Sequence, residues 1–146
     1  MNRTLCIGFK GKNNASGILV KRISPDSYLL TNSFNVIKKD IGLLNDSYER
    51  VILFGIDKNL IGTVRIEVVA EKETKEFSAL NLMEISAQLN KNGISNYLSD
   101  KPTHYLCNDA YWCLLQKFNK KVVLIHIPSI KNISERLIEK LCLVFG

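Results

Sequence analysis

The stretch "RVILFGI", residues Arg50–Ile56, is a nearly continuous apolar run. It lacks the alternation of polar and apolar residues that marks a strand with one face in water. A short run of this kind is typical of a strand that is buried on both faces, as in a parallel sheet covered by helices. We therefore predict that Arg50–Ile56 is a strand inside such a sheet.

Further strands are predicted on both sides of this run. Their segments are "TLCIGF" (4–9), "SYLLTN" (27–32), "TVRIEVVA" (63–70) and "KVVLIHI" (121–127). Between and after them lie segments whose apolar residues are three or four positions apart, which is helical spacing. The predicted helices cover 33–44, 78–93, 107–118 and 134–145.

The helix boundaries carry local signals. Ser33 and Ser134 are predicted N-caps, and Gly93 is a normal C-terminal stop. The apolar faces of the first two helices are predicted to consist of Phe34, Ile37, Ile41 and Leu44, and of Leu80, Met83, Ile85 and Leu89. Alternation of strands and helices predicts an α/β protein, folded as a three-layer α/β/α sandwich around a mostly parallel sheet.

Length and composition are those of a single globular domain spanning residues 1–146. The chain is 46% hydrophobic and 23% charged, and we find neither an internal repeat nor a linker rich in proline and glycine. Its longest apolar runs are far too short to cross a bilayer, and the N-terminal "LCIGF" is interrupted by Lys10 before it could form a signal-peptide core. We therefore expect a cytoplasmic protein that does not bind membranes.

Cysteine usage and charge argue against several classes of site. The four cysteines form no C-x-x-C pair and the chain has only two histidines, so we expect neither a metal site nor a disulfide framework. The net charge is +6, but lysines outnumber arginines and the basic residues are scattered along the chain. A nucleic-acid surface favours clustered arginines with aromatic residues between them. We therefore predict no nucleic-acid partner.

Three residues could form a catalytic set. Cys107 lies at the start of a predicted helix, where the helix dipole lowers the pKa of a thiol, and His126 lies near the end of a predicted strand. Glu67 interrupts an apolar strand, where a carboxylate is costly to bury unless it is paired. Taken singly, each has an ordinary alternative: a small apolar cysteine, a core histidine, and a glutamate that pairs with Lys121 or faces water beside Arg65. Taken together, they supply the nucleophile, base and orienting acid of cysteine-dependent acyl transfer.

Three motifs resemble the pyroglutamyl peptidases, which are cysteine exopeptidases that remove an N-terminal 5-oxoproline from peptides. They are "YLCN" (105–108), "LIHIP" (124–128) and "RIEVVA" (65–70), and they resemble the segments that carry the nucleophile, the histidine and the glutamate of that family. The resemblance implies that Cys107 is the nucleophile, that His126 is the general base and later the general acid, and that Glu67 orients His126. It also implies that the Cys107 N–H helps to bind the oxyanion, and that no cofactor is needed.

The same resemblance implies two substrate-binding residues, and the sequence also departs from the family. Phe9 corresponds to one of two aromatic residues that enclose the pyroglutamyl ring, and Asn108 follows the nucleophile. The second phenylalanine is missing, and the segment 71–81 is short and lacks the arginine that the family places near the oxyanion. His104 replaces a residue of the family motif and is a competing base, ranked below His126 because it lies in a predicted loop.

Two functions from different classes follow. The first is a shortened cysteine exopeptidase or amidase that acts on a peptide or a small amide, with altered specificity as one variant of this hypothesis. The alternative is a catalytically silent homologue that keeps the sandwich as an interaction or assembly module. Whether the chain forms a homo-oligomer stays open, because the family often assembles through surfaces near its loops and those loops are short in this chain.

Overall fold

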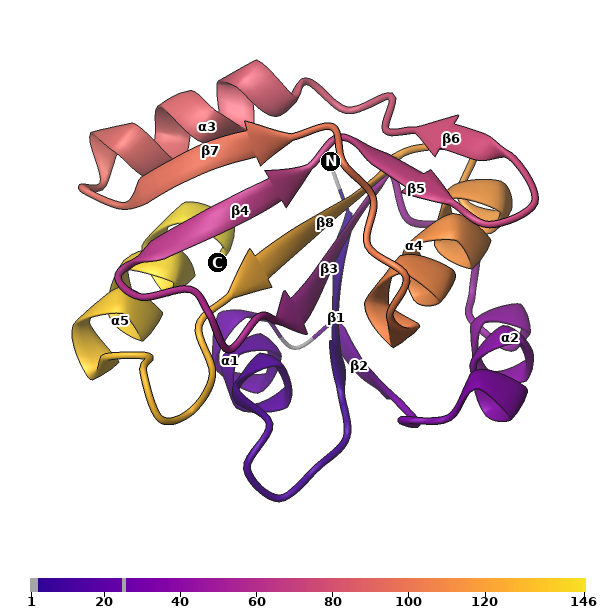
Figure 1. The fold of residues 1–146 in the computed structure, drawn as a ribbon, viewed down its shortest axis with the longest axis horizontal. Helices are drawn as coiled ribbons and strands as arrows, with labels where there is room; N and C mark the ends of the chain where they lie inside the picture. The colour runs from indigo at the N-terminus through magenta and orange to yellow at the C-terminus, as the bar shows by residue number, and fades with distance from the viewer. Residues whose placement is uncertain (1–2, 25) are drawn as a thin grey trace.

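A six-stranded sheet forms the centre of the computed structural model, which describes residues 3–24 and 26–146 (Figure 1). In the order β2-β1-β3-β8-β4-β7, its strands are Ser27–Leu30, Thr4–Phe9, Arg50–Ile56, Val122–Ile127, Thr63–Glu67 and Ser95–Ser99. The strands β8 and β4 pair antiparallel, and the other neighbours pair parallel. The prediction of a mostly parallel sheet is therefore confirmed.

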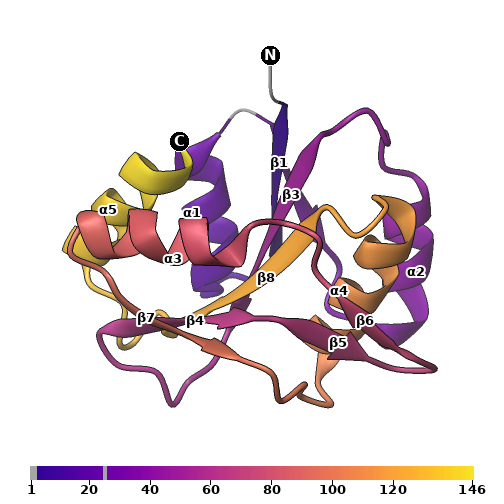
Figure 2. The same ribbon diagram turned by 90° about the horizontal axis from the view of Figure 1, so that it is seen from above.

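Helices cover both faces of this sheet (Figure 2). Those on one face are α1 (Ala15–Ile23), α3 (Leu82–Lys91) and α5 (Glu135–Phe145), and those on the other are α2 (Phe34–Gly42) and α4 (Leu106–Lys117). A small hairpin of β5 (Val69–Glu71) and β6 (Lys75–Phe77) continues from β4 and lies beside α4. This arrangement is the predicted α/β/α sandwich.

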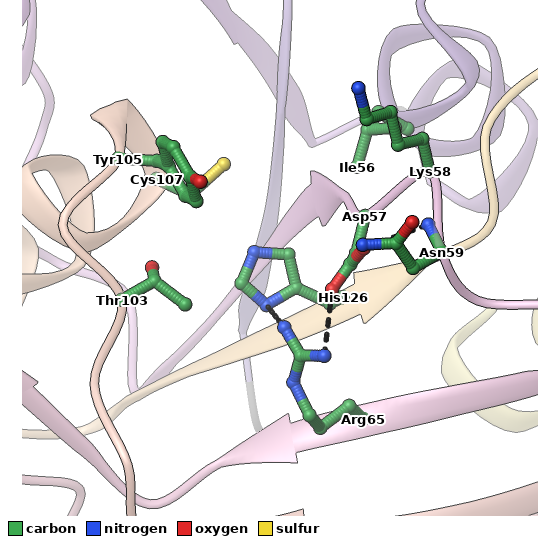
Figure 3. Close-up of a pocket in the computed structure, with 9 residues that line it drawn as sticks. All are labelled: Ile56, Asp57, Lys58, Asn59, Arg65, Thr103, Tyr105, Cys107 and His126. Atoms are coloured by element: carbon green, nitrogen blue, oxygen red, sulfur yellow. Dashed lines mark hydrogen bonds and ion pairs between the residues drawn. The ribbon is translucent and has the colours of Figure 1, made fainter.

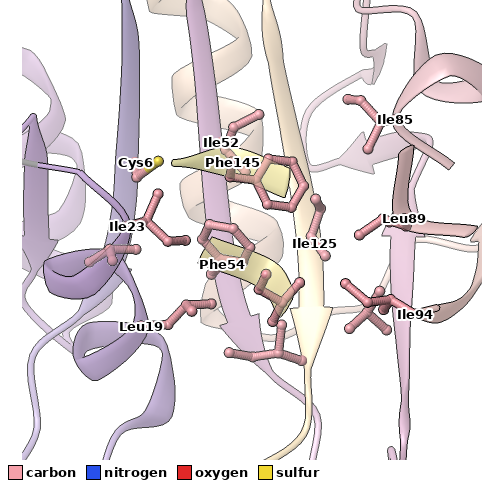
Figure 4. Close-up of a cluster of buried hydrophobic side chains, with 14 of the residues drawn as sticks. Cys6, Leu19, Ile23, Ile52, Phe54, Ile85, Leu89, Ile94, Ile125 and Phe145 are labelled. Atoms are coloured by element: carbon pink, nitrogen blue, oxygen red, sulfur yellow. The ribbon is translucent and has the colours of Figure 1, made fainter. Parts of the chain in front are cut away.

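The strand β3 occupies the position expected for its apolar sequence. Residues 51–54 are fully buried, and alternate side chains enter the two cores because successive residues of a strand point to opposite faces. Ile52 and Phe54 pack under α1 and α5, where the ring of Phe54 meets that of Phe145 edge to face at 5.6 Å (Figure 4). Val51 and Leu53 belong to the core on the side of α2 and α4.

Several elements differ from the sequence prediction. The segment 63–70 is not one strand, because it divides at Val68 into β4 and β5. The helix α1 and the strands β6 and β7 were not predicted. α1 contains a glycine and β-branched residues, which are weak helix formers, and it is stabilised by burial of Leu19 and Val20.

The predicted helix ends are partly confirmed. Ser134 caps α5, since its hydroxyl accepts a hydrogen bond from the Leu137 N–H at 3.0 Å. Ser33 holds the N-cap position of α2 but makes no capping hydrogen bond with its side chain. In α3, Met83 is exposed rather than buried, and the neighbouring residue Leu82 packs in the core instead, on the same face as Ile85 and Leu89. None of the helices within the described residues is long and apolar enough to cross a membrane.

Candidate active site

A cavity of about 370 Å³ lies where β3 and β8 end (Figure 3). Parallel strands in open α/β sheets commonly place ligand sites at this edge, where loops lead into helices. The cavity contains two of the three predicted catalytic residues. Its walls are formed by Ile56, Asp57, Lys58, Asn59, Arg65, Thr103, Tyr105, Cys107 and His126.

Cys107 and His126 meet over a glycine. Cys107 is the second residue of α4, and His126 pairs with Gly55 across the β3–β8 ladder. A Cβ atom placed on Gly55 would lie 2.5 Å from Cys107 Sγ and 3.3 Å from His126 Cδ2, so the sulfur and the imidazole share the space above this residue. Only glycine leaves that space open, because any larger side chain would overlap the thiol.

Glu67 lies on the Nδ1 side of the imidazole and does not line the cavity. Its Oε2 atom is 2.8 Å from His126 Nδ1, and both side chains are buried. A carboxylate can only accept a hydrogen bond, so Nδ1 carries the proton and donates it. Nε2 is then the basic nitrogen, and Figure 3 shows the ring between Arg65 on one side and Cys107 and Tyr105 on the other.

Arg65 and Asp57 complete the polar group and were not predicted as site residues. Arg65 Nε donates to Glu67 Oε2 at 2.5 Å, and Nη1 donates to Asp57 Oδ2 at 2.7 Å. Its Nη2 atom is 3.3 Å from His126 Nδ1, but both nitrogens carry hydrogen, so this is a contact between donors. The available signal was the spacing of Arg65 and Glu67, two positions apart and hence on one face of a strand. The alternative pairing of Glu67 with Lys121 is wrong.

The thiol of Cys107 does not have the low pKa expected from its place at a helix start. Burial raises its pKa to about 11, and the negative charges of Glu67 and Asp57 act in the same direction. Hydrogen bonds from the backbone N–H groups of Ile56 and Cys107 oppose this shift without cancelling it. The resting site therefore holds a neutral thiol, because desolvation of the thiolate outweighs the helix terminus.

Asp57 shows the opposite shift. Partial burial would raise its pKa, but hydrogen bonds from the Asn59 N–H and from Arg65 outweigh burial and lower it. The pKa of Arg65 is raised, since its hydrogen bonds to Glu67, Asp57 and Tyr97 outweigh the effect of burial. The ion pair between Asp57 and Arg65 is therefore fully charged at neutral pH.

The two predicted substrate-binding residues lie elsewhere. Phe9 is 2% exposed and packs in the core on the side of α2 and α4, so it does not line the cavity. Asn108 is also buried, and its amide accepts from the Glu71 N–H at 3.0 Å and donates to the Glu71 carbonyl at 2.6 Å. The structure thus places Phe9 in the core and bonds Asn108 of α4 to β5, and neither residue lines the cavity. His104 is exposed and does not line the cavity, so it is less well placed than His126 to act as the base.

One face of α4 is fastened to the β5–β6 hairpin. Asn108, Trp112 and Gln116 are four positions apart and project from the same side of the helix. Trp112 Nε1 donates to the Thr74 carbonyl at 3.1 Å, and Gln116 donates to Glu76 at 2.9 Å. The buried Tyr111 hydroxyl donates to the backbone carbonyl of Glu67 at 2.8 Å. These bonds fix the helix that carries the thiol relative to the strand that carries the carboxylate.

Comparison with solved structures places the fold among known enzymes. The pyrrolidone carboxyl peptidase from Thermococcus litoralis is 18% identical and aligns with a TM-score of 0.82 over 99% of this chain and 91% of that one. The pyroglutamyl peptidase I from Bacillus amyloliquefaciens is 16% identical, with a TM-score of 0.79 over 99% and 95% of the two chains. The pyrrolidone carboxyl peptidase from Thermus thermophilus is 13% identical, with a TM-score of 0.81 over 97% of each chain.

The chain therefore has the fold of the pyrrolidone carboxyl peptidases, as its motifs suggested. At these identities the likeness concerns the fold. No protein-family model and no curated protein sequence matches the chain.

The raised pKa of Cys107 predicts a particular pH dependence of its reactivity. Only the thiolate reacts with iodoacetamide, so the initial labelling rate of Cys107 should still be rising at about pH 10 instead of levelling off below pH 8. Mass spectrometry of the peptide that contains Cys107 measures this rate, with free cysteine as the reference. A plateau below pH 8 would contradict a neutral resting thiol.

The Asn108→Ala substitution should destabilise the protein. It leaves the N–H and carbonyl groups of Glu71 without their partners at a partly buried site, where each unsatisfied group costs about 1–3 kcal/mol. Urea unfolding should therefore show a loss of about 2 kcal/mol or more. Asn59→Ala, at an exposed position, is the control and should change stability little. Equal stability of the two variants would mean that Asn108 does not hold the hairpin.

Proposed function

We propose that this protein is a cysteine exopeptidase or amidase of the pyroglutamyl-peptidase type. It would remove an N-terminal pyroglutamyl residue from a peptide or cleave a related small amide, through a thioester intermediate. The observation that supports this most is the meeting of Cys107 and His126 over Gly55, with Glu67 bonded to the far nitrogen of the imidazole. The fold adds support, because proteins named as pyrrolidone carboxyl peptidases share it.

Attack begins from a neutral thiol and a neutral imidazole. As Sγ of Cys107 bonds to the carbonyl carbon, His126 Nε2 takes the thiol proton, and the carbonyl π electrons move to oxygen. The imidazolium that forms is stabilised by Glu67 through the 2.8 Å hydrogen bond. The backbone N–H of Cys107 lies in the first turn of α4, where N–H groups have no intrahelical acceptor, and it would bind the oxyanion.

Collapse of this intermediate releases the peptide. The oxyanion re-forms the carbonyl, the C–N bond breaks, and His126 gives its proton to the leaving amine. Water then attacks the thioester, again with His126 as the base, and the C–S bond breaks to return the thiol and free 5-oxoproline. Each proton that His126 takes is given back, so the site ends a turnover as it began.

The cavity suggests how a small ring could be held. Phe9 is unavailable because it is in the core, whereas Tyr105 lines the cavity and is 75% exposed. Its ring supplies an aromatic wall next to the thiol, which suits stacking on a planar lactam. A volume of about 370 Å³ is at the lower end for small-molecule sites, which suits one small residue better than a long peptide.

The second candidate is a silent homologue that serves as an interaction module. The raised pKa of the thiol favours it, because a buried neutral cysteine is less nucleophilic than a thiolate. The loss of Phe9 from the cavity wall favours it too. This candidate predicts that the wild-type protein hydrolyses no pyroglutamyl amide, so one assay separates the two functions.

The Cys107→Ser variant tests the nucleophile directly. Hydrolysis of a fluorogenic pyroglutamyl amide should fall by about a thousand-fold or more, because serine is a far weaker nucleophile in a site built for a thiol. Cys113→Ser, on another face of the same helix, should keep the wild-type rate. Activity that survives in the Cys107→Ser variant would remove Cys107 from the mechanism, and an inactive wild type would favour the silent homologue.

The Gly55→Ala variant tests the geometry without touching a reacting group. Its new Cβ atom would lie 2.5 Å from Cys107 Sγ, so the thiol must turn away from His126. A displacement of about 1 Å at a reacting atom costs about a hundred-fold in rate, and we expect kcat/KM to fall by that factor. Gly42→Ala is the matched control, since a Cβ there meets nothing within 4 Å. Equal rates in both variants would refute the contact over Gly55.

A further inference from the structure

Four charged or titratable groups form a continuous line through the site. Asp57 bonds to Arg65, Arg65 bonds to Glu67, and Glu67 bonds to His126, with contacts of 2.7, 2.5 and 2.8 Å. Glu67 Oε2 accepts from both Arg65 and His126, whereas Oε1 is buried and has no partner among the described residues. The carboxylate thus depends on donors at a single oxygen.

We propose that Arg65 is a positioning residue that keeps the Glu67–His126 pair free of an extra proton, so that His126 stays ready to accept the proton of Cys107, and that the charge of Asp57 moderates this effect of Arg65. The catalytic meaning of this inference rests on the proposed function. The electrostatic part does not, because it concerns proton binding by the resting protein.

Arg65 opposes an extra proton at both places where the pair could hold one. Glu67 is 2% exposed, and a carboxylate so buried takes up a proton readily unless a cation lies beside it. The guanidinium supplies that cation at 2.5 Å. On the other side, Nη2 lies 3.3 Å from His126 Nδ1, where it repels the positive charge of an imidazolium. Because Glu67 and His126 are joined by a 2.8 Å hydrogen bond, both effects act on the same pair.

Asp57 acts in the opposite sense. Its carboxylate offsets part of the charge of Arg65 through the 2.7 Å ion pair, and its own negative charge favours a proton on His126. Removing the charge of Asp57 leaves the positive charge of Arg65 less neutralised, so that this charge acts more strongly on Glu67 and His126. The pair should then bind its extra proton only at lower pH. The other titratable groups that line the cavity with His126 are Lys58, Tyr105 and Cys107.

Imidazole titration by NMR tests the inference without any substrate. The chain has two histidines, so a His104→Gln background leaves His126 as the only imidazole signal. Relative to this background, Arg65→Gln should move the titration midpoint of His126 to higher pH and Asp57→Asn should move it to lower pH. Each shift should be about one pH unit, the usual effect of one charge at this range. Arg65→Lys keeps the charge and should move the midpoint much less than Arg65→Gln.

A matched control separates charge from general damage. Arg22→Gln also removes an arginine from a 2.6 Å ion pair, here with Glu135 on the surface, and should leave the midpoint unchanged. Opposite shifts in the Arg65 and Asp57 variants would support the proposal, since a merely structural role cannot reverse sign between them. Shifts in the same direction, or none, would overturn it. If Arg65→Gln fails to fold, the midpoint is measured in Arg65→Lys and Asp57→Asn instead. An unmoved midpoint in Asp57→Asn then overturns the proposal.

Hydrolysis adds a second and separate readout. The acid limb of the pH profile of kcat/KM should move with the imidazole midpoint, upward in Arg65→Gln and downward in Asp57→Asn. Opposite NMR shifts in a protein without hydrolytic activity would leave the electrostatic inference standing and reject the proposed function. If the protein hydrolyses the substrate but the NMR midpoints do not move in the variants, the proposed function stands and the electrostatic inference is rejected.

Discussion

The antiparallel register between β4 and β8 is the constraint on which the site depends. Arg65 pairs with His126 and Glu67 with Leu124, so the imidazole has the arginine directly opposite and the glutamate on the diagonal. All three side chains point to one face, since residues two apart in a strand share a face. A slip of one residue would send Arg65 and Glu67 into the core under α3 and leave His126 without a partner. The reversal of strand direction at β4 is therefore what assembles the polar group.

The central strands, the edge strand β2 and four of the helices were predictable from the sequence, whereas the strands β6 and β7 and the helix α1 were not. β1, β3 and β8 are short, continuous apolar runs, and each has an interior that is nearly fully buried. β7, with the sequence "SNYLS", lies at the edge of the sheet and buries little, so its pairing with β4 leaves almost no trace in its hydrophobic pattern. The weak helix α1 was missed for a different reason, because tertiary packing and not local propensity determines it.

The candidate site was predicted in its residue types but not in its electrostatics. Cys107, His126 and Glu67 were identified from motifs, and the structure brings them together at one edge of the sheet. Local sequence could not reveal that Phe9 is in the core or that Asn108 bonds to a hairpin 37 positions away. The prediction of a lowered pKa for Cys107 was wrong for a related reason. Helix position is visible in a sequence, whereas burial depends on the whole fold.

Because α4 is hydrogen-bonded to the β5–β6 hairpin, the geometry of the site depends on the hairpin staying closed. The hairpin is a small two-stranded unit whose strand β6 is mostly exposed, so we expect it to open more easily than the central sheet. Since Asn108 follows the thiol directly and β5 follows Glu67 after one residue, its opening would loosen nucleophile and orienting acid at once. Local opening of the hairpin would thus disturb the reactive geometry while the main core stays folded.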